Sequence, residues 1–214
     1  MDASKLKVAG QRMYDFASEL FPICRSITGN GVRETMTMLG DYLPIDCHEV
    51  SSGTQVLDWT IPKEWNIRDA YIANISGKKI IDFNDSNLHV VGYSQPISMT
   101  LSMKELKPHL YSLPDQPDRI PYRTGYFNKD WGFCLSQNVL DQMKDDRYEV
   151  FIDSELKDGS LTYGELLIPG RSSDEVLLCA HTCHPSLAND NLSGIVLLCE
   201  LGKWLLSNNQ KLEL

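Results

Sequence analysis

The sequence has no concentration of positive charge and no long apolar run. Its 214 residues carry a net charge of −9, and no segment gathers Lys and Arg into the patch that a phosphate backbone requires. No run approaches the roughly 20 apolar residues of a membrane span, and the first residues lack the apolar core of a secretory signal. These absences argue against nucleic acid and membrane as partners. The scattered cysteines indicate reduced thiols and so favour a cytoplasmic protein.

The cysteines show no paired spacing. None of the six lies in a Cys-x-x-Cys motif, so neither a disulfide framework nor a closed structural zinc site is expected. Apolar neighbours, as at Cys179 and Cys199, favour small buried thiols. With 42% hydrophobic and 23% charged residues, the composition is that of an ordinary folded chain with a core.

Two helices are predicted in the first 43 residues. Apolar residues share one helical face in each of two segments: Leu6, Met13, Phe16, Ala17 and Leu20, then Val32, Met36, Leu39 and Leu43. Phe21-Pro22 ends the first helix, and the turn residues 28–31 precede the second.

A change in the residue pattern after the two helices predicts an inserted domain. Residues 46–115 contain short β-leaning runs separated by Gly and Pro turns, and the Pro-bearing passage that begins at residue 113 indicates a boundary. We therefore expect a main domain of residues 1–45 and 116–214, interrupted by a small β-rich domain of residues 46–115.

The second part of the main domain has an α/β pattern. Strands are predicted at residues 148–153, 161–168 and 175–180, with a hairpin turn at Asp158-Gly159 between the first two. The third is apolar on successive residues, which is typical of a central strand covered on both faces. A helix over residues 192–206 is expected to pack on that sheet.

Residues 181–194 carry the chemistry. His181 stands at the predicted end of the third strand, where active sites of α/β sheets lie. Imidazole is a good zinc ligand, and the carboxylate of Asp190, across a strand-to-helix loop, can reach the same cation. On an extended backbone His181 and Cys183 point one way and His184 the other, so both histidines would share an ion only if the turn at Pro185 rotates the second.

A purely structural interpretation of this segment stays open. Asp190 or Asn191 can serve as the N-cap of the following helix, with Pro185 as a turn residue and both histidines in ordinary hydrogen bonds. Spacing alone does not separate this interpretation from a metal site.

The segment His-Thr-Cys-His-Pro-Ser-Leu-Ala-Asn-Asp-Asn-Leu-Ser-Gly resembles the first metal-binding signature of the co-catalytic zinc exopeptidases. That resemblance implies one or two zinc ions, with His181 as a terminal ligand and Asp190 as the bridging carboxylate. Residues 20–29, 58–65, 120–126 and 131–135 resemble a bacterial family of aminopeptidase-like proteins, some labelled as polysaccharide-biosynthesis proteins, with an inserted domain of unknown function. The implied fold is an incomplete three-layer α/β/α sheet of the phosphorylase/hydrolase-like kind.

The sequence departs from those enzymes in two ways. Cys183 stands where they have an Asp that orients the ligand His, and a thiol is a poorer acceptor. Their general-base Glu and remaining ligands come from segments that would follow Leu214. We therefore expect the N-terminal part of a zinc-dependent aminopeptidase-like hydrolase of small peptides or related amides. It would hold no catalytic residue and no other cofactor site, and would be inactive alone; oligomerisation stays open.

Two rival functions and one residue cluster also stay open. An aminopeptidase-like scaffold without metal would bind a peptide, a sugar precursor or a protein. Cys183 would act as a nucleophile only with a His base, and on a strand His184 faces away from it. Arg25 and the cluster of Tyr122, Arg123, Tyr126 and Trp131 are either substrate contacts or packing residues, with Arg25 paired to a carboxylate.

Overall fold

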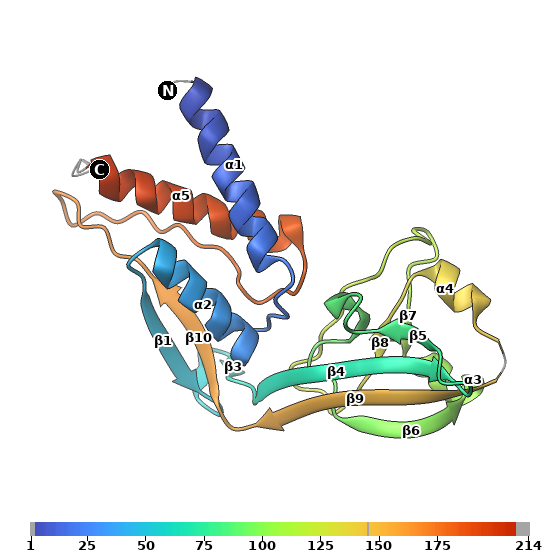
Figure 1. Cartoon of the computed structure of the whole chain (residues 1–214). Coiled ribbons are helices and arrows are strands. Elements are labelled where there is room, and N and C mark those ends of the chain that lie inside the picture. The colour runs from blue at the N-terminus through green and yellow to red at the C-terminus, as the bar shows by residue number, and fades with distance from the viewer. Residues whose placement is uncertain (1–2, 145, 209–214) are drawn as a thin grey trace. The chain divides into compact units, whose positions relative to one another are not determined.

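The structure is a computed structural model that describes residues 3–144 and 146–208, and the chain divides into two compact units (Figure 1). Unit 1 comprises Met1–Val50 and Ser160–Leu214, and unit 2 comprises Ser51–Gly159. Unit 1 is mainly helical, whereas unit 2 is built on an antiparallel sheet. The chain is thus mixed α/β, as expected.

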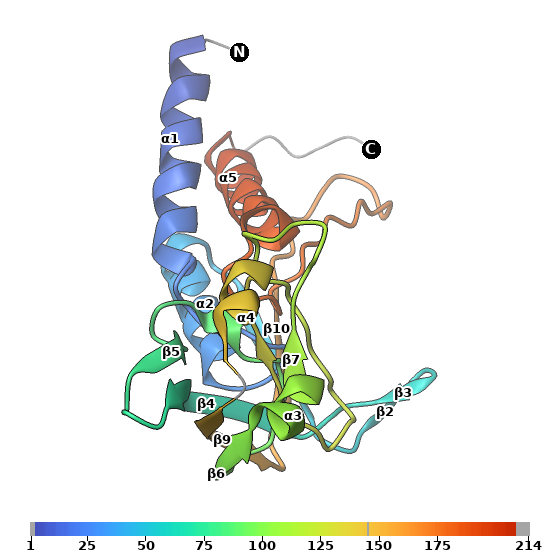
Figure 2. The same cartoon turned by 90° about the vertical axis from the view of Figure 1, so that its right-hand side faces the viewer.

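Unit 1 contains three long helices and two paired strands. In chain order its elements are α1 (Ala3–Leu20), α2 (Asn30–Tyr42), β1 (Asp46–Ser51), β10 (Ser160–Glu165), η3 (Ala188–Leu192) and α5 (Ser193–Asn208). Strand β1 pairs with β10, and α1 lies beside α5 (Figure 2). Among the residues described, no helix is both long and apolar enough to cross a membrane.

The two helices predicted at the N-terminus are confirmed, and their apolar faces form the core of unit 1. Its buried members come from α1, α2, η3 and α5 and from the residue after α2: Phe16, Leu20, Val32, Met36, Leu39, Leu43, Leu192, Ile195, Val196 and Cys199. Leu6 is an exception to the predicted face, since it is exposed near the start of α1. The helix expected over residues 192–206 is α5.

An ion pair also joins α1 to α5. The Arg12 guanidinium donates to both carboxylate oxygens of Glu200, at 3.0 and 2.6 Å, and the Tyr42 hydroxyl donates to the same carboxylate. The hydrogen bond from Arg12 holds the pKa of the Glu200 carboxyl below its usual value, although partial burial opposes this effect.

Unit 2 consists of short elements around two long strands. In chain order these are β2 (Gln55–Val56), β3 (Trp59–Thr60), β4 (Glu64–Asn74), β5 (Lys79–Asp82), η1 (Asn87–His89), β6 (Ile97–Ser102), α3 (Met103–Leu106), η2 (Lys107–His109), β7 (Leu110–Tyr111), β8 (Phe133–Cys134), α4 (Gln137–Gln142) and β9 (Arg147–Lys157). The main sheet has the order β5-β4-β9-β6, and its neighbouring strands are all antiparallel.

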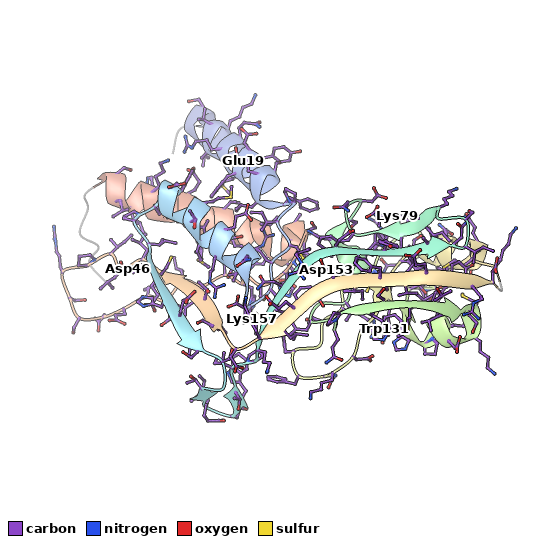
Figure 3. All side chains as sticks on the ribbon, turned by 60° about the horizontal axis from the view of Figure 1, so that its bottom comes forward. Glu19, Asp46, Lys79, Trp131, Asp153 and Lys157 are labelled. Carbon is purple, nitrogen blue, oxygen red and sulfur yellow. The ribbon has the colours of Figure 1, made fainter. Side chains whose placement is uncertain are left out.

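Strands β4 and β9 organise this sheet. They pair from Glu64 opposite Lys157 to Asn74 opposite Tyr148, with one irregularity after Ile67; Figure 3 labels Asp153 and Lys157 along β9. Successive side chains of a strand point to opposite faces of a sheet. One face of this sheet is buried against residues of later elements. The core comprises Ala70, Ile72, Ile81, Val90, Leu106, Leu110, Phe133, Leu135, Tyr148, Val150 and Ile152.

The two units do not follow the expected domain limits. Unit 2 extends from residue 51 to residue 159 rather than from 46 to 115, because β9 pairs with β4 in one sheet. The Pro-bearing passage is held inside this unit, since Asn138 N donates to the oxygen of Pro117 at 3.0 Å. The prediction of a hairpin at Asp158-Gly159 was wrong, because β9 pairs with β4 and β6, and β10 pairs with β1.

The central strand expected at residues 175–180 was also wrong. This segment has no helix or strand assignment, and four of its six residues are exposed large hydrophobics or cysteine: Val176, Leu177, Leu178 and Cys179. Leu177 alone is 87% exposed. A strand needs a neighbouring backbone for its N–H and C=O groups, and within residues 3–144 and 146–208 no strand pairs with this segment.

Candidate metal-binding loop

Residues 181–187 form a loop that is fastened to the segment after α1. The Ser186 hydroxyl donates to the main-chain oxygen of Phe21 at 2.8 Å. The Arg25 guanidinium donates through Nε to the main-chain oxygen of His184 at 3.1 Å. Two segments about 160 residues apart in sequence are thereby joined at the place where the resemblance puts a metal ligand.

Arg25 is the anchor of this junction and is almost completely buried. It is 2% exposed, and its Nη1 donates to the main-chain oxygen of Leu20 at 2.6 Å. The expected carboxylate partner is replaced by these two main-chain oxygens, and among the described residues Nη2 has no hydrogen-bond partner. Burial lowers the pKa of Arg25 to about 10, since a cation is poorly solvated there.

The structure places His184 near Asp190. His184 Nδ1 lies 3.7 Å from Asp190 Oδ1, and the ring centroids of His181 and His184 are 6.1 Å apart at an interplanar angle of 82°. The prediction that the two histidines point to opposite sides assumed a strand. Because residues 181–184 form a loop, alternation does not apply, and the expectation that set His184 apart from His181 and Asp190 had depended on it.

Asn191, rather than Asp190, caps the helix that follows. Its Oδ1 accepts from the main-chain N–H of Gly194 at 3.1 Å, which is the bond an N-cap makes. A Cβ on Gly194 would lie 2.1 Å from that oxygen, so the cap requires glycine there. The Asp190–Asn191 peptide is cis, and the Asp190 side chain is 67% exposed. The Asp190 carboxylate is therefore not needed for capping.

Cys183 lies beside His184 rather than apart from it. Its Sγ is 3.6 Å from His184 Nδ1, so the thiol and imidazole that strand geometry would have separated are neighbours. Burial raises the pKa of the Cys183 thiol, Asp190 raises it further, and Arg25 opposes both. A raised pKa keeps the thiol protonated and disfavours it as a nucleophile.

The donor atoms of this loop are of the kind that zinc binds, but they do not form a complete site. Imidazole nitrogen and carboxylate oxygen are both common zinc ligands. Within residues 3–144 and 146–208, however, no group of three or more His, Cys, Asp or Glu side chains is arranged to hold a metal ion. His184 and Asp190 are two such side chains that the structure brings close together, at 3.7 Å.

A family match covers nearly the whole chain. Residues 14–213 match the family described as "Domain of unknown function (DUF4910)". The chain belongs to this family. A curated relative from Clostridium acetobutylicum is 56% identical over 196 residues and is named "Putative polysaccharide biosynthesis protein with aminopeptidase-like domain". The match covers 92% of this chain and 45% of that relative.

A solved structure has the same fold as this DUF4910 chain. It is a crystal structure described as that of a "putative peptidase" from Clostridium acetobutylicum, with a TM-score of 0.92 and 54% sequence identity. It aligns with 96% of this chain and 48% of its own. The chain thus spans about half the length of the relatives that it matches, and these relatives support the expected aminopeptidase-like family.

Proposed function

We propose that the complete protein is a zinc-dependent, aminopeptidase-like hydrolase of peptide or related amide bonds, and that this chain supplies its first metal-binding loop. The observation that carries the proposal is that Asp190, exposed and not used as the helix cap, lies 3.7 Å from the imidazole of His184, in the loop that also carries His181. The names of the two relatives support a peptidase. Zinc would supply the Lewis acidity that amide hydrolysis needs.

We assign His181 and Asp190 as ligands and retain His184 as the competing imidazole. Arg25 and Ser186 hold the loop that carries both histidines by hydrogen bonds to residues 184 and 21, which restricts where the imidazoles lie. The remaining ligands, the general base and the rest of a three-layer α/β/α sheet would come from residues outside these 214, in a protein as long as the relatives.

Calorimetric zinc titration of the full-length protein, after removal of metal with a chelator, tests this assignment. His181→Ala and Asp190→Asn should each weaken zinc binding by at least about tenfold, since each removes a donor atom from the metal. The matched control is His48→Ala, because His48 Nε2 also lies near a carboxylate, Glu165, at 3.2 Å in the same unit. Zinc binding unchanged by His181→Ala would remove His181 from the site.

A non-catalytic, aminopeptidase-like binding protein is the second candidate. Cys183 favours it, because burial keeps this thiol protonated where related enzymes carry an orienting carboxylate. Metal analysis of freshly purified full-length protein, together with hydrolysis of aminoacyl p-nitroanilides, separates the candidates. Zinc with turnover supports the hydrolase, whereas neither zinc nor turnover supports the binding protein.

A further inference from the structure

Unit 2 contains a cavity of about 410 Å³ that the proposed hydrolase chemistry does not use. Its volume lies within the range of small-molecule sites, about 300–1,000 Å³. Four aromatic residues line it, together with the polar side chains of a cation, an amide and a carboxylate: Tyr93, Tyr111, Tyr122, Trp131, Arg123, Asn128 and Asp130. Part of the aromatic cluster noted in the sequence therefore lines a cavity within one unit.

The aromatic walls of the cavity are fixed by stacking. The Trp131 ring stacks on His109 with centroids 3.8 Å apart, and His109 Nδ1 also lies 3.0 Å from the main-chain oxygen of Trp131. The Arg123 guanidinium lies over the Tyr111 ring, 4.5 Å from its centroid. Figure 3 labels Trp131 among the side chains of unit 2. Such rings offer flat apolar surface in a fixed orientation.

Main-chain hydrogen bonds hold the floor of the cavity. Gly92 N donates to the oxygen of Arg123 at 2.8 Å, and Gly125 N donates to the oxygen of Gly92 at 3.0 Å. A Cβ on Gly92 would lie 2.7 Å from the Thr124 hydroxyl oxygen, so this close approach requires glycine. The cavity is therefore formed before any ligand binds, which lowers the ordering cost of binding.

A strained residue lies in this floor. Tyr93 has a φ of 69°, which non-glycine residues rarely adopt. It is held there by stacking on Trp65, with centroids 5.7 Å apart, and by an edge contact with Tyr126 at 5.1 Å. Backbone strain of this kind concentrates at ligand-binding sites and persists where the surrounding structure enforces it.

The polar groups are balanced in charge and complementary in hydrogen bonding. Arg123 only donates, Asp130 only accepts, and Asn128 does both. Asp130 Oδ1 already accepts from the main-chain N–H of Trp131 at 2.8 Å. Sugar hydroxyls donate and accept at once, and the C–H faces of a sugar ring are apolar. A phosphorylated ligand would place two negative charges near Asp130 with a single cation to oppose them.

We propose that this cavity binds a neutral monosaccharide or disaccharide unit, with its ring against Tyr122 or Trp131 and its hydroxyls on Arg123, Asn128 and Asp130. The site lies wholly within unit 2. It does not depend on the metal-binding loop, so the two proposals can fail separately.

Ligand-observed saturation-transfer NMR on this chain tests the proposal, with methyl glycosides of glucose, galactose and N-acetylglucosamine, lactose, alanyl-alanine and inorganic phosphate as probes. At least one saccharide should receive saturation from the protein. In protein-observed spectra the same saccharide should shift the Trp131 indole N–H resonance, which Trp131→Phe identifies. Arg123→Ala and Asp130→Asn should each weaken that binding about tenfold or more, since each removes a charge-assisted hydrogen bond.

The matched controls are Arg119→Ala and Asp118→Asn, which alter an exposed ion pair of 3.7 Å elsewhere in unit 2. Both should bind the saccharide as the parent chain does. Three results would overturn the proposal: no saccharide binding, equal losses in the control variants, or binding of alanyl-alanine or phosphate alone. Unchanged thermal unfolding midpoints show that a loss of binding is not a loss of folding.

Discussion

Apolar residues are buried in the main sheet of unit 2 but exposed in the segment of residues 175–180 in unit 1. In unit 2, β4 and β9 are each 11 residues long and pair at ten positions, and Ile72 and Ile152 are almost fully buried. In unit 1, the equally apolar residues 176–178 are exposed. An apolar segment favours burial, but it is buried as a strand only where a neighbouring strand pairs with it.

The largest effect is expected from a cavity in the sheet core. Ile152→Ala should destabilise unit 2 by about 2–5 kcal/mol, because it removes packed methylene groups that the neighbours cannot replace. Urea unfolding followed by tryptophan fluorescence measures this, since Trp65 is buried in the same unit. Thr100→Ala on β6, which is exposed, should change stability by less than about 0.5 kcal/mol.

The junction at Arg25 should be nearly as sensitive, although it lies next to irregular structure. Arg25→Ala removes the donor to the part-buried main-chain oxygen of His184, at about 1–3 kcal/mol. The main-chain oxygen of Leu20 also loses Arg25 but keeps the N–H of Ile23 at 3.2 Å. The rate of amide hydrogen exchange at residues 181–187 should therefore be higher in this variant than in the parent chain. In Arg33→Ala, which breaks an ion pair with Glu49, the loop should exchange as before. Unaltered exchange in Arg25→Ala would mean that Arg25 does not hold the loop.

Substitutions of Asn191 and Asp190 should differ in their effect on stability by a smaller amount. Asn191→Ala removes the helix cap and should cost about 1 kcal/mol. Asp190→Asn should change stability by less than about 0.5 kcal/mol, because this side chain is exposed. Chemical unfolding of both variants measures the difference, and the reverse order would assign the cap to Asp190.

The ion pair between α1 and α5 should make unit 1 sensitive to acid. The folded-state pKa of Glu200 is lowered by Arg12, so its stabilisation is present above the unfolded-state pKa and is lost as pH falls through the folded value. Thermal unfolding between neutral pH and pH 3 should therefore decline less steeply in Glu200→Gln. Glu19→Gln, on the exposed side of α1 (Figure 3), is the control and should keep the parent slope.

The smallest effect is expected in the exposed apolar segment. Leu177→Ser should change stability by less than about 0.5 kcal/mol in this chain, because the side chain is 87% exposed. The same urea titration used for Ile152→Ala measures it. A loss comparable to that of Ile152→Ala would show that Leu177 is buried, and the contrast between the two segments would disappear.

Local patterns predicted the helices well and the strand partners poorly. Val32, Met36 and Leu39 recur at helical spacing, and all three are buried on α2. The turn at Asp158-Gly159 was assigned to a hairpin because its residues suit one, yet the strands on either side pair with β4 and with β1. Helix hydrogen bonds are local, whereas strand pairing joins residues that are distant in the chain. The local pattern of a single sequence therefore does not predict which strands pair.

The candidate loop shows the same division. His181 and Asp190 were identified from residue type and resemblance, but the contact of His184 with Asp190 depends on a loop that strand alternation did not describe. Arg25 was noted in the sequence, while its bonds to Leu20 and His184 required the fold. The cavity beside Trp131 likewise brings together residues 91–93, Tyr111 of β7 and residues between 122 and 131 that lie outside helices and strands.

The sequence by itself determined the helices of unit 1, the absence of paired cysteines and the residue types available to a metal or a ligand, because these follow from composition and local spacing. Only the tertiary structure decided where unit 2 ends, which imidazole approaches Asp190 and which aromatic rings share a cavity. Those outcomes depend on contacts between residues far apart in the chain, and such contacts form only when the whole unit folds.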